Sequence, residues 1–307
     1  MTKGEAVYQC VPNFSEGRSR ATVEALVCAA QSVPGAQVVD YSLDQDHNRS
    51  VVTILASETA LHDAVLAMAD VAVQRIDLRT HLGEHPRFGA IDVVPIVPIR
   101  NTSDILADIA AHKIGKDIAS KLHIPIYFYE LSAADPARTL PYIRRQLASA
   151  DTDTVTVTLT PDEGPLLPHH TAGVCVLGAR HSLVAYNVDL NTDKIEIAKT
   201  IASSIRRHRE CGDIAELQGV RALGMFLPSR GRAQVSMNLT DPAASPLKAV
   251  WEYVRTQANR LGVDAVESEI IGVIPAVSLG SATPESIHWD SFHPGKIIED
   301  WLRKSGD

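Results

Sequence analysis

The sequence predicts an α/β (α+β) protein of two ferredoxin-like βαββαβ subdomains, whose mixed or antiparallel sheets face a central cleft. Strand-like and helix-like segments follow one another in the order β-α-β-β-α-β, which is typical of the split βαβ unit, and the same order returns in the second half. The length of 307 residues also fits two ordinary domains of roughly 150 residues. We therefore expect one subdomain at residues 1–172 and the other at residues 173–307.

Apolar runs and helical spacing predict the elements of the first half. A strand at residues 6–11 precedes a turn and a helix at residues 20–31, which Pro34 and Gly35 end. Further strands are expected at residues 37–42, 50–56, 91–98 and 126–129. Further helices are expected at residues 57–74, 103–122 and 141–147. Residues 149–168, rich in Thr, Asp and Pro, are expected to connect the halves.

The second half repeats this order. A strand at residues 182–190 comes first, and Asn191 is expected to cap a helix with Ala198, Ile201 and Ile205 on one stripe. Strands at residues 219–226 and 232–239 are expected to form a hairpin, and apolar and polar residues alternate in the second of them. The remaining elements are a helix that begins at Ser245-Pro246, a strand at 265–274 and a helix at 297–302.

Composition excludes several classes of function. Lys and Arg number 29 against 37 Asp and Glu, so the formal charge is −8 and nucleic acid is not an expected partner. The first residues lack the apolar core of a signal peptide, and no apolar stretch reaches the ~20 residues that a membrane span needs. The 4 cysteines lie far apart and form no zinc or disulfide pattern. We expect a cytoplasmic protein that does not bind a membrane.

Residues 81–89 contain the densest polar cluster of the chain. His81, Glu84 and His85 match the H-x-x-E-H pattern of inverted zinc proteases, which requires both histidines on one face of a helix. Gly83 and Pro86 argue against a helix, because they cost about 1 and about 3 kcal/mol in a helix interior. The other interpretation is a rigid loop whose polar groups satisfy their own backbone.

Two further clusters allow a structural and a functional interpretation. Residues 44–49 lie between predicted strands, where Asp and Asn favour a turn, but Asn48 and Arg49 also suit the binding of a carboxylate. Residues 11–18, which include Asn13, form a strand-to-helix junction. This junction is either a plain turn or a place where free backbone amides receive an anion.

Several motifs spread over the chain belong together. They are, in chain order, Cys10-Val11-Pro12-Asn13-Phe14-Ser15-Glu16-Gly17, Asn48-Arg49, Gly83-Glu84-His85-Pro86-Arg87, Gly89-Ala90 with Asp92, Gly178-Ala179-Arg180, Ala185-Tyr186-Asn187 and Gln234-Val235-Ser236. With these motifs the chain resembles the glutamate formiminotransferases, also called glutamate formimidoyltransferases, over almost its whole length. In animals this domain is fused to a cyclodeaminase, and the chain resembles the transferase domain alone.

The resemblance implies transfer of a formimino group from N-formimino-L-glutamate to N5 of tetrahydrofolate, as in histidine degradation. Tetrahydrofolate would be the co-substrate, no metal is expected, and the family suggests a homodimer. The catalytic histidine of the family maps onto His85, which we expect to act as general acid/base because an imidazole exchanges protons near neutral pH. Glu84 is in a position to orient His85.

The family's folate-binding segment maps onto residues 164–173. Gly164, Pro165 and Gly173 match, whereas His169-His170 and Thr171 stand near where the vertebrate members carry Pro-Ser-Trp. Both substrates are anionic and the protein is acidic, so attraction must come from local arginines such as Arg100. We thus predict substrate or folate binding by Asn13, Asn48, Arg49, Glu84, Arg87, Gly164, Pro165, Gly173 and Arg180.

Three other functions stay open from the sequence. The first is a folate enzyme that uses another one-carbon donor, such as 5-formyltetrahydrofolate. The second is a folate-binding protein without turnover. The third is a metal-dependent hydrolase that uses His81, Glu84 and His85.

Overall fold

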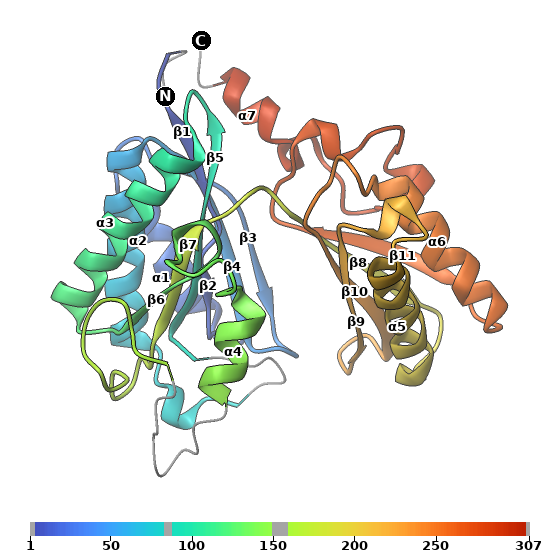
Figure 1. The fold of residues 1–307 in the computed structure, drawn as a ribbon, viewed down its shortest axis with the longest axis horizontal. Helices are drawn as coiled ribbons and strands as arrows, with labels where there is room; N and C mark the ends of the chain where they lie inside the picture. Colours follow the sequence, from blue (N-terminus) through green and yellow to red (C-terminus); the bar gives the residue numbers. More distant parts are fainter. Residues whose placement is uncertain (1–3, 83–87, 149–158, 305–307) are drawn as a thin grey trace. The chain divides into compact units, whose positions relative to one another are not determined.

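The computed structural model describes residues 4–82, 88–148 and 159–304. Contacts divide the chain into two compact units, with the boundary between His181 and Ser182. Each unit contains helices and one sheet, which is mixed in the first unit and antiparallel in the second (Figure 1). The predicted α/β class is therefore confirmed. Within the described ranges, none of the helices has the length and apolar character of a membrane span.

The first unit contains a 7-stranded sheet. Its strands are β1 (Val7–Cys10), β2 (Asn13–Phe14), β3 (Gln37–Asp44), β4 (Arg49–Ala56), β5 (Ile91–Arg100), β6 (Ile126–Phe128) and β7 (Cys175–Ala179). The order is β1-β4-β2-β5-β7-β6, with β3 beside β4 and an additional pairing between β1 and β5. The pairs β5–β7 and β6–β7 are parallel, and the other pairs are antiparallel.

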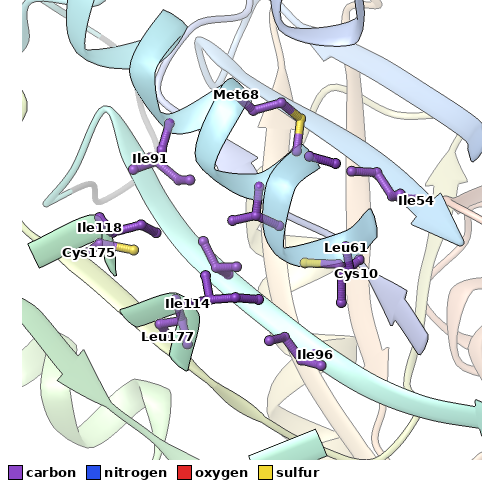
Figure 2. Close-up of a cluster of buried hydrophobic side chains, with 14 of the residues drawn as sticks. Cys10, Ile54, Leu61, Met68, Ile91, Ile96, Ile114, Ile118, Cys175 and Leu177 are labelled. Carbon is purple, nitrogen blue, oxygen red and sulfur yellow. The ribbon is translucent and has the colours of Figure 1, made fainter. Parts of the chain in front are cut away.

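Helices α1 (Arg20–Gln31), α2 (Glu58–Arg75) and α3 (Asp104–Leu122) cover one face of this sheet (Figure 1). Figure 2 shows Leu61 and Met68 of α2 and Ile114 of α3 in the apolar layer between helices and strands. Neighbouring residues of a strand point to opposite faces. Val94 and Leu177 lie in this layer, so Val93 and Val176 face the other side, where Ile143 of α4 (Leu140–Ala148) packs on them.

The second unit has a 4-stranded antiparallel sheet in the order β11-β8-β10-β9. Its elements are β8 (Val184–Leu190), α5 (Ile195–Cys211), β9 (Val220–Leu227), β10 (Arg232–Leu239), α6 (Leu247–Arg260), β11 (Ala265–Ile271) and α7 (Ile298–Lys304). Helices α5 and α6 lie on one face (Figure 1), where Val188 and Val235 join the core. Asp189 and Gln234 alternate with these residues and therefore point to the opposite face.

Short 3-10 helices join these elements. They are η1 (Leu78–Thr80), η2 (Glu130–Ser132), η3 (Ala215–Leu217), η4 (Ala276–Ser278), η5 (Glu285–Ile287) and η6 (Pro294–Lys296).

Most predicted elements are found within a few residues of their expected bounds, but four details differ. Residues 13–14, predicted as part of a turn, form strand β2, which pairs with β4 and β5. Strand β7 was not predicted, and it extends the first sheet by parallel pairing with β5 and β6. Asn191 does not cap α5, which begins at Ile195, because its amide bonds Asp264 instead, with Nδ2 to Oδ2 at 3.0 Å. Helix α6 begins at Leu247, one residue later than expected, and the Ser245 hydroxyl accepts a hydrogen bond from the Gly219 amide.

Candidate functional site

The junction after β1 is hydrogen-bonded to Gly89 and Ala90, which follow residues 83–87 in the chain. The backbone amide of Ser15 donates to the Ala90 carbonyl at 3.0 Å, and its hydroxyl donates to the Gly89 carbonyl at 2.7 Å. Asn13 uses its side-chain amide locally, since Nδ2 donates to the Val11 carbonyl at 2.8 Å. The junction therefore contains strand β2, which pairs with β4 and β5, and its hydrogen bonds fix the start of β5.

Asn48 links two loops of the first unit. Its Oδ1 accepts from the Gly17 amide at 2.9 Å, and its Nδ2 donates to the Leu82 carbonyl at 2.9 Å. The residue is buried and adopts a φ of 49°, a left-handed conformation that Asn tolerates better than most residues. Gly17 is required for this approach, because a Cβ there would lie 2.1 Å from the Asp44 carbonyl oxygen. Asn48 thus positions Leu82.

Asp92 fixes the chain on the other side of residues 83–87. This carboxylate is 2 % exposed, and its Oδ1 accepts from the amides of Phe88 at 2.8 Å and Gly89 at 3.2 Å. Its Oδ2 accepts from Nη2 of Arg144 in α4 at 3.3 Å. Two buried polar side chains, Asn48 and Asp92, therefore hold Leu82 and Phe88.

Arg49 is the first residue of β4 and interacts by charge with Asp92 and Arg144. These three residues are called the Asp92 cluster below. Burial lowers the pKa of Arg49, and the nearby Arg144 lowers it further, while Asp92 and Asp44 oppose both effects. The Asp44 carboxylate is already engaged, because it accepts from the His47 amide at 2.9 Å and lies 2.5 Å from His47 Nδ1. Burial would raise the pKa of Asp44, but the hydrogen bonds from His47 and the charge of Arg49 lower it overall.

The residues predicted to carry the chemistry fall outside the described ranges. Glu84, His85 and Arg87 lie within residues 83–87, which the structure does not describe. Their roles stay predictions. What the structure describes is the support on both sides of this segment.

The last residues of the predicted folate segment, residues 164–173, lie next to Phe88 and Gly89. Gly173 forms a bridge with Gly89, and a Cβ at Gly173 would lie 2.1 Å from the Phe88 carbonyl oxygen. The amide of Ala90 donates to the Ala172 carbonyl at 2.9 Å. Gly164 lies at the other end of the segment with a φ of +88°, and a Cβ there would contact Ala119 and the Ile124 carbonyl. The end of the segment at Gly173 therefore lies next to Phe88 and Gly89, whose amides donate to Asp92.

The two histidines of this segment bond to neighbouring groups. His169 Nδ1 accepts from the Ala172 amide at 3.0 Å, and burial, with the charges of His123 and His170, lowers the pKa of His169. Nη1 of Arg79 lies 2.7 Å from Nε2 of His170. In the described part of the chain, no group of three His, Cys, Asp or Glu side chains is arranged to hold a metal ion.

Arg180 is not brought to this cluster. It follows the last residue of β7, whereas Gly173 precedes the first, so the strand separates them. Its guanidinium donates from Nη1 to the His181 carbonyl at 2.8 Å.

Two residues of the Asp92 cluster, Asp92 and Arg144, were not predicted as site residues. Asp92 could have been recognised from the sequence, because it is a lone carboxylate in an otherwise apolar predicted strand. Arg144 could not, since a basic residue on a short amphipathic helix is ordinarily a surface residue.

Comparisons with known proteins agree with the motifs. Residues 7–180 match the family model of the formiminotransferase domain, N-terminal subdomain, and residues 185–288 match that of the formiminotransferase domain. The glutamate formimidoyltransferase of Thermoplasma acidophilum is 38% identical over 98% of this chain and 99% of its own length. That of Streptococcus pyogenes serotype M1 is 38% identical over 96% of this chain and 98% of its own length.

A longer relative matches in part. The formimidoyltransferase-cyclodeaminase of Gallus gallus is 37% identical over 87% of this chain, which spans 50% of that protein. The chain therefore belongs to the formiminotransferase domain family, which confirms the resemblance that its motifs indicate.

Proposed function

We propose that this protein transfers the formimino group from N-formimino-L-glutamate to N5 of tetrahydrofolate, and releases 5-formiminotetrahydrofolate and L-glutamate. The observation that carries the proposal is the match, at 38% identity and over nearly the full length of both chains, to a protein named glutamate formimidoyltransferase. The match includes both family domains. The protein is thus a one-carbon group transferase, with tetrahydrofolate as co-substrate.

His85 is proposed as the general acid/base. It takes the proton that N5 loses as the new bond to the formimino carbon forms, and returns a proton to the glutamate nitrogen as the old bond breaks. An imidazole suits both steps because its ordinary pKa of about 6.5 lies near neutrality. One such group contributes about 10²- to 10⁴-fold, so alignment of the two substrates must supply much of the remaining rate.

The described residues support this chemistry by positioning. Asn48 holds Leu82 and Asp92 holds Phe88, so the chain enters and leaves residues 83–87 at fixed points. Asn48 therefore acts in this proposal as a positioning residue.

The folate is proposed to bind along residues 164–173. Leu166 and Leu167 are 68% and 67% exposed, and they offer apolar surface to a flat ring system. Gly173 brings the end of this segment beside Phe88 and Gly89. We further propose that the protein is a cytoplasmic homodimer with small-molecule substrates, and that it binds neither nucleic acid nor membranes.

A steady-state assay with two donors tests the proposal. Purified protein is mixed either with N-formimino-L-glutamate and tetrahydrofolate or with 5-formyltetrahydrofolate and L-glutamate, and the folate products are separated and quantified. We expect turnover with the formimino donor. Turnover with the formyl donor alone would favour the other folate enzyme, and folate binding without any turnover would favour a binding protein.

A further inference from the structure

We propose that His169 is a positioning residue for tetrahydrofolate, because its neutral imidazole holds the turn at residues 169–173 that ends the folate segment. The inference rests on the proposed function, in which the folate binds along residues 164–173. It assigns to one side chain of this segment a task that depends on the protonation state of that side chain.

The turn at residues 169–173 is closed by its own backbone. The His169 amide donates to the Gly173 carbonyl at 2.8 Å, and the Gly173 amide donates to the His169 carbonyl at 2.9 Å. The carbonyl of Thr171, inside the turn, accepts from the Leu78 amide at 2.9 Å. The turn is thus hydrogen-bonded both within itself and to the chain around η1.

One imidazole nitrogen serves two further amides of the turn. Nδ1 of His169 accepts from the Ala172 amide at 3.0 Å and from the Thr171 amide at 3.3 Å. A backbone N–H can only donate, so Nδ1 holds no proton in this arrangement. Ala172 is fully buried, and a buried amide that loses its acceptor is costly because water does not reach it. The turn therefore needs the neutral form of His169.

This turn fixes one end of a short, exposed apolar stretch. Before the stretch, Glu163 forms a bridge with Ile126 of β6, and its carbonyl accepts from the Ile126 amide at 2.9 Å. Residues 165–168 lie between the two fixed ends and have the sequence Pro-Leu-Leu-Pro, in which each proline restricts its own φ. Leu166 and Leu167 are the exposed residues of this stretch. They are the apolar surface that the turn keeps in place for the folate.

Protonation of His169 would remove the acceptor. Burial lowers the pKa of His169, and the charges of His123, which follows α3, and of His170 lower it further. His170 bonds elsewhere, since its Nε2 lies 2.7 Å from Nη1 of Arg79, which is paired with Asp77. Both amide bonds to His169 are therefore present at neutral pH. They are lost as the pH falls through the folded pKa of His169, which lies below the ordinary value of 6.5.

Two substitutions at position 169 separate the acceptor from the proton. Asn places Oδ1 near the position of the imidazole Nδ1 and does not titrate, whereas Ala has no acceptor. We expect His169→Ala to raise the Kd for tetrahydrofolate about tenfold at about pH 8, and His169→Asn to keep it within about threefold. In both variants the KM for N-formimino-L-glutamate and the kcat at saturating tetrahydrofolate should stay within about twofold.

The pH profile of tetrahydrofolate binding is the second readout. Wild type and His169→Asn are titrated by anaerobic calorimetry between about pH 8 and about pH 5. As the pH falls, the wild type should lose affinity relative to His169→Asn, by up to about tenfold, because only the wild type loses its acceptor. His85 and His170 are present in both proteins, so their titration cancels in the ratio. His181→Asn, at an exposed histidine of the first unit, is the matched control and should follow the wild type at every pH.

Nitrogen-15 NMR of the imidazoles checks the protonation state without a ligand. At neutral pH, His169 should be the tautomer with the proton on Nε2 and none on Nδ1. A proton on Nδ1 at neutral pH would overturn the inference.

Failure of this inference is distinguishable from failure of the proposed function. Wild type that binds tetrahydrofolate no better than folded His169→Ala, at a constant ratio to His169→Asn over the whole pH range, would overturn the inference alone. Binding that depends on His169 in a protein that transfers nothing would contradict the proposed function but support the inference. Wild type that binds no tetrahydrofolate at any pH would overturn both. If His169→Ala fails to fold, the pH profile of His169→Asn decides.

Discussion

Asp92 in the first unit and Asp189 in the second are both 2 % exposed, and each accepts a hydrogen bond from an arginine. The charged groups around them are arranged differently. Near Asp92, Arg144 donates to this carboxylate, and the charges of both Asp92 and Asp44 act on Arg49. Near Asp189, one guanidinium serves two carboxylates, since Arg230 donates from Nη1 to Asp189 at 3.0 Å and from Nη2 to Glu269 at 3.2 Å. Gln234 adds a hydrogen bond to Asp189 at 2.7 Å.

The pKa values of the arginines follow this difference. Burial and Arg144 lower the pKa of Arg49. Burial would also lower the pKa of Arg230, but Glu269 and Asp189 raise it well above its ordinary value. The comparison teaches that a buried aspartate–arginine pair does not by itself indicate a ligand site. In both units carboxylates act on the arginine, and the first unit adds a second cation, Arg144, whose charge lowers the pKa of Arg49.

The largest expected effect separates catalysis from structure. His85→Ala should lower kcat by about 10²- to 10⁴-fold, because the proton acceptor and donor is lost. Calorimetric titration should show tetrahydrofolate binding within a few-fold of the wild type. His181→Ala, at an exposed histidine of the first unit, is the control and should keep full activity. A kcat for His85→Ala within threefold of the wild type would remove this residue from the mechanism.

Arg230→Met should act on stability in the second unit. Removal of the cation leaves buried Asp189 beside Glu269, at a cost of about 1–3 kcal/mol after allowance for the partial exposure of Arg230. Urea unfolding at neutral pH measures it. Equal stability of variant and wild type at neutral pH would mean that the network contributes nothing.

Asn48→Ala should affect both stability and rate in the first unit. The variant loses hydrogen bonds to Gly17 and Leu82 and places Ala at a positive φ, which together cost about 1–3 kcal/mol. We expect kcat to fall about tenfold because Leu82 is released. Asn48→Asp keeps the acceptor for Gly17 but not the donor to Leu82. If Asn48→Asp keeps the wild-type kcat, the link to Leu82 is not needed for catalysis.

The smallest effect concerns Asp44 and pH. Its folded pKa lies below the ordinary value of 3.8, so its contribution to stability is present above that value and is lost as the pH falls through the folded pKa. Asp44→Asn should therefore destabilise the protein slightly at neutral pH, by up to about 1 kcal/mol for a partly exposed pair. Unfolding curves of variant and wild type should converge in acid. A difference that persists there would have another cause.

Elements with a strong periodic pattern were predictable from the sequence. Helix α1 has the predicted bounds, because its apolar stripe lies between the cap Ser19 and the turn at Pro34. Strand β7 was missed because it is a short buried strand, whose apolar run has no alternation to mark it. Asn191 was assigned to the nearest helix, although a residue 73 positions away is its partner.

The candidate site was predictable only in part. Asn48 was singled out from its motif, yet its contacts to Gly17 and Leu82 depend on loops that meet only in the fold. The pairing of Arg144 with Asp92 joins residues 52 positions apart, and no local pattern encodes it. Local sequence thus indicated which residue types carry the chemistry, and tertiary packing decided which of them support one another.

Single-turnover transfer of a labelled group tests the central claim most directly. N-formimino-L-glutamate labelled with ¹³C at the formimino carbon is mixed with tetrahydrofolate and excess protein, and the label is followed by NMR. The account predicts that the label moves to N5 of the folate while an equal amount of unlabelled L-glutamate appears. Label that stays on the glutamate, or that is released without joining the folate, would contradict it.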